Sequence, residues 1–126
     1  MKSRPGFSSC TPGPRRALRR LEVRFRPAAL EDLQDIYLFV FRASANTRIA
    51  RGFVDRIVER RRRIGDAPFG GPARDDLAPG LRIVPFERSA VIAYRVEDDC
   101  VRIIDVFYGG RDFEAFFRRG GAEDNR

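Results

Sequence analysis

Hydrophobic and polar residues follow a strand-like pattern along four short stretches of the chain and recur at helical spacing along two longer ones. In "LEVRFR", Leu21, Val23 and Phe25 alternate with charged residues, which is typical of a half-buried strand. Strand-forming stretches follow at residues 81–86, 90–96 and 101–108. Because only short connectors separate these last three, they predict an antiparallel meander.

The two longer stretches lie between the first strand and the meander and predict amphipathic helices. Pro27 suits the first turn of the first helix, and the acids within residues 31–35 lie early, where the helix dipole favours negative charge. Ser44 or Asn46 can cap the second helix, and Gly65 is placed to end it. The short link between the helices predicts an antiparallel hairpin.

Two strands of the meander differ in what they indicate about position in the sheet. Pro85 cannot donate a ladder hydrogen bond, so its strand is expected at an edge or at a bulge. "AVIAYRV" is apolar on both faces, which predicts an interior strand. After the meander, "DFEAFFRR" predicts a short helix with Phe113, Phe116 and Phe117 on one side.

These elements predict one small two-layer α+β domain at residues 21–118. Its order is an N-terminal strand, an antiparallel helical hairpin, a three-stranded antiparallel meander and a short C-terminal helix. The helices must bury their apolar faces, and the sheet offers the surface for it. Residues 119–126 are expected to fray.

The net charge of +7 is concentrated at the start of the chain. Residues 1–20 hold six of the 25 basic side chains and none of the 18 acidic ones, so the remaining 106 residues carry only +1. The opening stretch also has three Pro, two Gly and no periodicity, which predicts a disordered basic tail. The charge of the whole chain therefore gives no support for strong direct nucleic-acid binding by the folded domain.

Residues 1–20 do not resemble a secretory signal, because they lack an apolar core segment. They are Arg-rich and free of acids, like an organellar transit peptide, but short. Another interpretation places them upstream of the true start, with translation from a non-ATG codon near Leu21 or Val23, since Met1 is the only methionine. Simple disorder or a later start is favoured over targeting.

The chain lacks several residue types on which common active sites depend. It has no histidine, the usual general base and the commonest metal ligand. Cys10 and Cys100 form no C-x-x-C motif, so neither a zinc site nor a dithiol redox site is indicated. No apolar run is long enough to cross a membrane. We expect no metal, no cofactor, no membrane association and a cytoplasmic location.

Four stretches together resemble the RelE/ParE toxins of bacterial type II toxin–antitoxin modules: "FRPAALEDLQDIYLFV", "APFGGPARDDLAPGLR", "VIAYRV" and "VRIIDVFYGGRD". The resemblance covers roughly residues 21–118 and implies a RelE/ParE-like fold. It also implies a cognate antitoxin whose disordered segment folds onto the toxin in a hetero-oligomer.

The resemblance implies two different activities for the two branches of the family. RelE-type members cleave messenger RNA on the ribosome, with basic side chains at the phosphate and a C-terminal tyrosine; ParE-type members lack that set and poison DNA gyrase. Arg82 and Arg111 match the two family arginines, but Phe117 stands near the tyrosine position and no Tyr follows Tyr108. Arginine is a poor proton acceptor or donor, since its pKa lies above about 12.

The sequence therefore predicts a ParE-like gyrase poison that acts by binding and has no catalytic residues. The expected target-binding residues are Arg82, Arg111, Phe113, Phe116 and Phe117. A ribosome-dependent endoribonuclease and a degenerate, non-toxic member that sequesters antitoxin are the alternatives.

Both arginines also have a structural interpretation. Arg111 could pair with Asp105 or Asp112, or bond free carbonyls at the chain end, while Arg82 could pair with Asp75 or Asp76.

Deleting residues 1–20 should leave folding and antitoxin binding unchanged, because the composition of this stretch predicts no packed structure. Loss of its six positive charges should also abolish most non-specific DNA retention at moderate salt. Thermal melting, antitoxin pull-down and DNA retention on a filter measure the three effects. DNA binding that persists in the truncated chain would reveal a basic patch within the folded domain.

Overall fold

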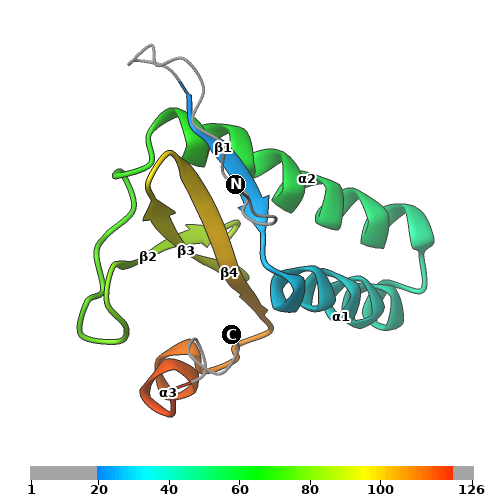
Figure 1. The fold of residues 1–126 in the computed structure, drawn as a ribbon. Coiled ribbons are helices and arrows are strands. Elements are labelled where there is room, and N and C mark those ends of the chain that lie inside the picture. Colours follow the sequence, from blue (N-terminus) through cyan, green and yellow to red (C-terminus); the bar gives the residue numbers. More distant parts are fainter. Residues whose placement is uncertain (1–19, 121–126) are drawn as a thin grey trace.

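The computed structural model describes residues 20–120, and the predictions for residues 1–19 and 121–126 lie outside this range. Seven elements follow one another along the chain (Figure 1). They are β1 (Glu22–Phe25), α1 (Pro27–Ser44), α2 (Thr47–Asp66), β2 (Leu81–Phe86), β3 (Ala90–Glu97), β4 (Cys100–Tyr108) and α3 (Phe113–Arg118). The predicted α+β order is confirmed.

The four strands form one sheet in the order β1-β4-β3-β2. The meander pairs antiparallel as predicted, and β1 adds to it in parallel with β4, so that Phe25 aligns with Ile103. β2, which contains Pro85, lies at an edge, and β3 lies between two neighbours. Both placements follow from the missing N–H of proline and from the apolar character of both faces of β3.

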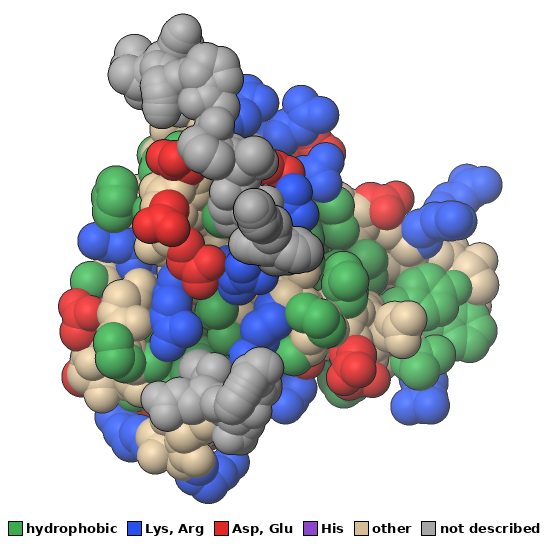
Figure 2. Space-filling model, viewed as in Figure 1, with side chains coloured by type: hydrophobic (Ala, Val, Ile, Leu, Met, Phe, Trp, Pro, Cys, Tyr) green, Lys and Arg blue, Asp and Glu red, His purple; other side chains and the backbone are tan. Residues whose placement is uncertain are grey.

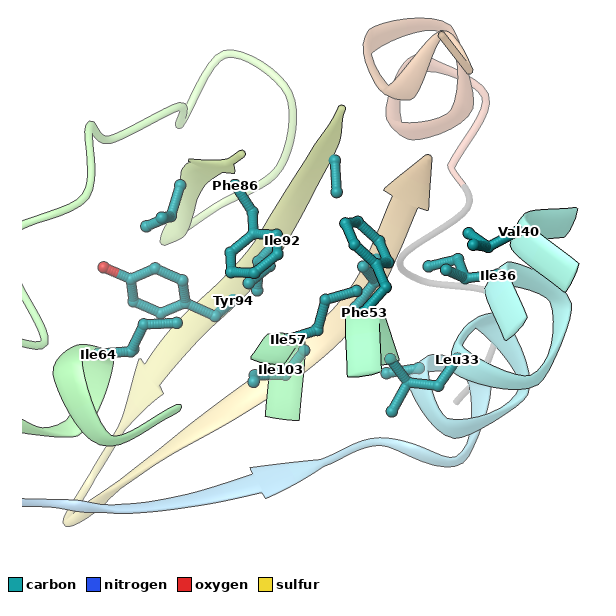
Figure 3. Packing of buried hydrophobic residues seen from close by; sticks show 14 of the residues in the cluster. Leu33, Ile36, Val40, Phe53, Ile57, Ile64, Phe86, Ile92, Tyr94 and Ile103 are labelled. Atoms are coloured by element: carbon teal, nitrogen blue, oxygen red, sulfur yellow. The ribbon is translucent and has the colours of Figure 1, made fainter. Parts of the chain in front are cut away.

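The helical hairpin covers one face of the sheet and forms the main core with it (Figures 1 and 3). Figure 3 shows α1, α2 and the sheet contributing side chains to the same packed layer: Leu33, Ile36, Val40, Phe53, Ile57, Ile64, Phe86, Ile92, Tyr94 and Ile103. Full burial of such a side chain stabilises the fold by about 1.5–3 kcal/mol. The amphipathic spacing read from the sequence thus decides how the hairpin is oriented.

The turn between the helices uses one of the two predicted caps. The side chain of Asn46 accepts hydrogen bonds from the backbone N–H groups of Arg48 and Ile49, at 2.9 and 3.1 Å. Ser44 instead donates its hydroxyl hydrogen to the carbonyl oxygen of Val40. Asn46 therefore starts α2, because it satisfies N–H groups that have no partner within the helix.

The sequence was wrong about Gly65, which does not end α2. The helix continues through Asp66, and Gly65 is buried. A Cβ atom at this position would lie 2.5 Å from the carbonyl oxygen of Leu21, whose N–H donates to the Gly65 carbonyl at 3.0 Å. Glycine is required there because the chain entering β1 passes directly against the helix.

The opposite face of the sheet is covered in part by α3 and by the loop before β2. Phe117, Leu77 and Leu81 are buried there against Phe107 and Ile104 of β4. Figure 1 shows α3 beyond the end of β4, away from the helical hairpin. β4 is therefore buried on both faces.

Tyr94 fixes the loop that follows α2. Its side chain is fully buried on β3, and its hydroxyl donates to the carbonyl oxygen of Pro68 at 2.8 Å and accepts from the N–H of Gly71 at 3.1 Å. A Cβ at Gly71 would lie 2.7 Å from the same hydroxyl. The sequence indicated only that the strand containing Tyr94 is interior, and the role of its hydroxyl in holding the loop depends on tertiary contacts.

Tyr94→Phe should destabilise the protein by about 1–3 kcal/mol, because it leaves the buried N–H of Gly71 and the partly buried carbonyl of Pro68 without their partner. Urea unfolding measures the loss, and hydrogen exchange should rise at Gly71. Tyr37→Phe, on the half-buried side of α1, is the matched control. Equal stability of the two variants would contradict the proposed role of the hydroxyl.

Candidate functional site

Arg111 leaves the sheet at the end of β4. Gly109 and Gly110 precede it with φ angles of 73° and 80°, a backbone conformation that favours glycine. Arg111 is exposed, and its guanidinium lies 5.6 Å from the centre of the Phe107 ring. A cation over an aromatic face is attracted by the ring quadrupole, so the Phe107 ring orients the side chain of Arg111 without an ion pair to an acid.

Neither acid proposed as a structural partner of Arg111 is available to it. Asp105 is buried and pairs with Arg26 at 3.1 Å. The carboxylate of Asp112 accepts from the N–H of Ala115 at 3.0 Å and caps α3. Within residues 20–120, the ion pairs do not include Arg111. Its cation therefore remains available to a ligand.

A hollow of about 500 Å³ lies beside Arg111. Figure 1 shows that β4 ends in this region, between α1 and α3. The walls of the hollow are mostly aromatic or apolar, and they come from α1, from the β2–β3 turn, from β4 and from the start of α3. The residues that line it include Phe39, Pro85, Arg88, Phe107, Arg111 and Phe113. The second arginine, Arg88, gave no signal in the sequence, because only the pairing of β2 with β3 and β4 brings it here.

Arg82 does not join Arg111. Arg82 lies near the start of β2 and aligns with Tyr94. Arg111 follows the end of β4, at the opposite end of the sheet. The guanidinium of Arg82 donates to the carbonyl oxygens of Phe69 and Gly71 at 3.1 and 2.7 Å and lies 5.1 Å from the centre of the Phe69 ring. These contacts anchor the loop after α2.

The two acids proposed as partners of Arg82 are also engaged elsewhere. Asp75 accepts from the N–H of Gly80 at 2.8 Å, and Asp76 pairs with Arg74 at 2.9 Å. The structural contacts of Arg82 are thus backbone carbonyls, which the sequence could not have identified.

The three phenylalanines of α3 share one side of the helix, as their spacing predicted, and all three contact one aromatic residue of β4. Phe113, Phe116 and Phe117 lie with ring centres 6.0, 5.4 and 5.7 Å from that of Phe107. Phe117 is only 3% exposed, so it belongs to the core in this structure. Of the three, Phe113 lines the hollow beside Arg111.

A carboxyl pair lies where α1 contacts β4. Asp32 accepts from the N–H of Val106 at 2.9 Å and shares a side-chain hydrogen bond with Asp105. Burial, and then the hydrogen bond with Asp105, raises the pKa of Asp32 to about 8, while the charge of Arg111 opposes the rise. Because Asp105 has Arg26 as its cation, we place the shared proton on Asp32.

The sequence assigned the early acids of α1 to the helix dipole, which was wrong for Asp32. The first turn of α1 contains no acid. Asp32 instead ties the second turn of the helix to the backbone of β4, a contact between residues far apart in the chain. It does not line the hollow.

Within residues 20–120, no group of three or more histidine, cysteine or acidic side chains is arranged to hold a metal ion. None of the helices in this range combines the length and the apolar character needed to span a membrane.

A family model described as the ParE toxin of the type II toxin–antitoxin system parDE matches residues 23–113, well over half of the chain. The chain belongs to the ParE toxin family. This range includes the helical hairpin, the sheet except for Glu22 at its start, and the hollow with Arg88 and Arg111. A search of curated proteins found no match.

Solved toxin–antitoxin structures share the fold of this ParE-family chain. The chromosomal ParDE system from P. aeruginosa matches with a TM-score of 0.61 and 22% identity, over 71% of this chain and 96% of the other. The RelBE2 toxin–antitoxin complex from Mycobacterium tuberculosis matches with a TM-score of 0.53 and 23% identity, over 73% of this chain and 94% of the other. The predicted RelE/ParE-like fold is confirmed.

Stability should fall as pH rises, because Asp32 holds a proton in the folded chain that an unfolded aspartate loses near pH 4. Between about pH 4 and pH 8 the native state binds more protons than the unfolded state, which makes the slope negative. Asp32→Asn keeps an acceptor for Val106 and a donor for Asp105 but removes the titration. The free energy of unfolding of Asp32→Asn, relative to that of the parent, should therefore be greater at pH 8 than at pH 5. Since Asp32 is half-buried and partly screened, we expect a difference of about 1.4 kcal/mol.

Urea unfolding at pH 5 and pH 8 measures this difference. Glu31→Gln, one position earlier on the exposed side of α1, replaces an exposed carboxyl group with an amide and should leave the pH profile unchanged. A profile that Asp32→Asn does not alter would show that the carboxyl pair is not protonated in the folded protein.

Proposed function

We propose that this ParE-family toxin acts by binding DNA gyrase in the cytoplasm and that a cognate antitoxin neutralises it. The observation that carries the proposal is the hollow at the end of β4. It combines exposed Arg111, which has no ion-pair partner within residues 20–120, with aromatic walls, and no acid or histidine lines it. Arginine and aromatic side chains are the types that dominate protein-binding hot spots.

The same hollow lacks what RNA cleavage requires. Attack by a 2′-hydroxyl needs a group that accepts its proton and another that protonates the leaving oxygen. Arginine stays charged and does neither, and the hydroxyl-bearing Tyr108 lies with its ring against the edges of Phe39 and Phe53. The pKa of Asp32 is raised, but its carboxyl group is already hydrogen-bonded to the backbone of β4 and to Asp105, and it does not line the hollow. Binding is therefore the activity that the geometry supports best.

The helical hairpin offers an apolar surface for the antitoxin. Figure 2 shows hydrophobic side chains gathered over the outer end of the hairpin. Leu30 and Leu38 on α1 and Ile49 on α2 are among the large hydrophobic residues that remain exposed. A disordered antitoxin segment that folds on binding can cover such side chains, and the similarity to solved toxin–antitoxin structures supports this partner.

A non-toxic member that only sequesters antitoxin would keep the hairpin surface without a use for the hollow. Expression separates this alternative from a toxin. A short adjacent reading frame, with a DNA-binding N-terminus and an amphipathic tail, would identify the module.

Expression without antitoxin should induce DNA-damage signalling and accumulate cleaved DNA covalently linked to gyrase, while messenger RNA stays intact at first. Recovery of protein–DNA adducts with a gyrase antibody and sequencing of messenger-RNA ends measure the two effects. Co-expression with the product of the adjacent frame is the control. Rapid cleavage of messenger RNA in translating ribosomes would replace the gyrase proposal with the nuclease one, and an absence of toxicity would favour the antitoxin sink.

A further inference from the structure

The turn between β2 and β3 holds Arg88 in an unusual backbone conformation. Glu87 and Arg88 are its two central residues, with φ angles of 48° and 61°, and the N–H of Ser89 donates to the carbonyl of Phe86 at 3.1 Å. Two-residue turns of this kind favour asparagine, aspartate or glycine, because other side chains are strained at positive φ. Such strained conformations persist only where surrounding contacts hold them, and they are concentrated at functional sites.

The strained turn is held from outside by α2. Arg56 forms two hydrogen bonds to the carboxylate of Glu87, from Nε at 2.8 Å and from Nη2 at 3.0 Å. With the turn fixed, the next residue, Arg88, faces the hollow that Arg111 also lines. Within residues 20–120 no ion pair neutralises Arg88. Two arginines from separate parts of the chain thus share one aromatic hollow without an acid.

We propose that Arg88 and Arg111 together bind a carboxylate in an acidic segment of the target protein, with an adjacent apolar side chain of that segment in the hollow. The assignment to a target protein rests on the proposed function. Guanidinium groups bind carboxylates through paired, charge-assisted hydrogen bonds, and the aromatic walls suit an apolar side chain. Phe39, 52% exposed, forms the open wall on α1.

The ring arrangement favours a protein segment over a nucleic acid. Stacking of a base requires an open aromatic face. Arg111 lies over the face of Phe107, and Phe39, although 52% exposed, packs edge to face with Tyr108 with ring centres 5.0 Å apart. Residues 21–126 also carry a net charge of only about +1, the whole-chain +7 less the six charges of residues 1–20, which is small for tracking phosphates.

Arg88→Gly separates binding from folding. Glycine adopts positive φ without strain, so this variant of the full chain should melt at the same temperature as the parent or higher. Its affinity for a short glutamate-containing peptide should nevertheless fall, by about tenfold for the loss of one charged hydrogen-bonding group. A lower melting temperature in Arg88→Gly would instead identify Arg88 as a structural residue.

The probe is a blocked five-residue peptide in which two glutamates flank a leucine, compared with the same peptide carrying glutamines. Backbone amide shifts in the full chain should move at Ser89, Gly109 and Gly110 with the glutamate peptide only. Arg88→Gly and Arg111→Gln should each weaken this binding about tenfold. Arg62→Gln, on α2 where Arg62 pairs with Glu59, removes an equal charge and should have no effect.

Three outcomes would overturn the inference. Equal weakening by Arg62→Gln would reduce the effect to general charge, and shifts confined to other parts of the chain would place the peptide elsewhere. A single-stranded oligouridylate that binds the hollow with the same dependence on Arg88 and Arg111 would favour a nucleic-acid ligand. Purified gyrase subunits form a separate arm: peptide binding without gyrase binding would contradict the proposed target and leave the carboxylate site standing.

Discussion

Burial of β4 on both faces is the constraint on which the other elements depend. Val101, Ile103 and Val106 pack beneath the helical hairpin, while Ile104 and Phe107 pack beneath α3 and the loop before β2. β3 pairs along one edge of the strand, and on the other edge β1 pairs with residues 100–103. Beyond β1, the side chains of Arg26 and Asp32 bond the backbone at Ile104 and Val106, so these groups also have protein partners. A strand enclosed in this way cannot shift its register without exposing one apolar set and burying another.

The enclosed strand determines where the candidate site lies. Its last residues pass from the core to Gly109 and Gly110, which turn the chain, and Arg111 is the first charged side chain beyond them. Phe107 contacts both the core and the candidate site. Its ring packs against the phenylalanines of α3 and also lies beneath the guanidinium of Arg111. The site is therefore built on rigid core residues, which reduces the entropy that binding must overcome.

Charges near β4 divide into those that stabilise the fold and those left for a ligand. Arg26 compensates buried Asp105, Asp32 bonds the backbone at Val106, and Arg56 holds Glu87 in its strained turn. Because these three acids are engaged by other groups, no ion pair within residues 20–120 neutralises Arg88 or Arg111 at the hollow. A positive site with apolar walls follows from this distribution, although the folded part of the chain is nearly neutral in total.

The sequence by itself determined the elements and much of their arrangement, because these depend on local periodicity and local chemistry. The spacing of apolar residues in α1 and α2, the missing N–H of Pro85 and the apolar faces of "AVIAYRV" act within one element and its immediate neighbour. The spacing of Phe113, Phe116 and Phe117 likewise predicted one packed side of α3. Arg111 was placed after a strand end for the same reason.

Only the tertiary structure decided which residues meet across the chain. The need for glycine at position 65 comes from the backbone of Leu21, and the proton on Asp32 comes from burial against β4. Arg82 bonds the loop after α2 and does not reach Arg111. Arg88, which belongs to no recognisable sequence motif, lies near Arg111 because β2, β3 and β4 pair. Such contacts join positions tens of residues apart, and their energies depend on distance and burial, which no local pattern encodes.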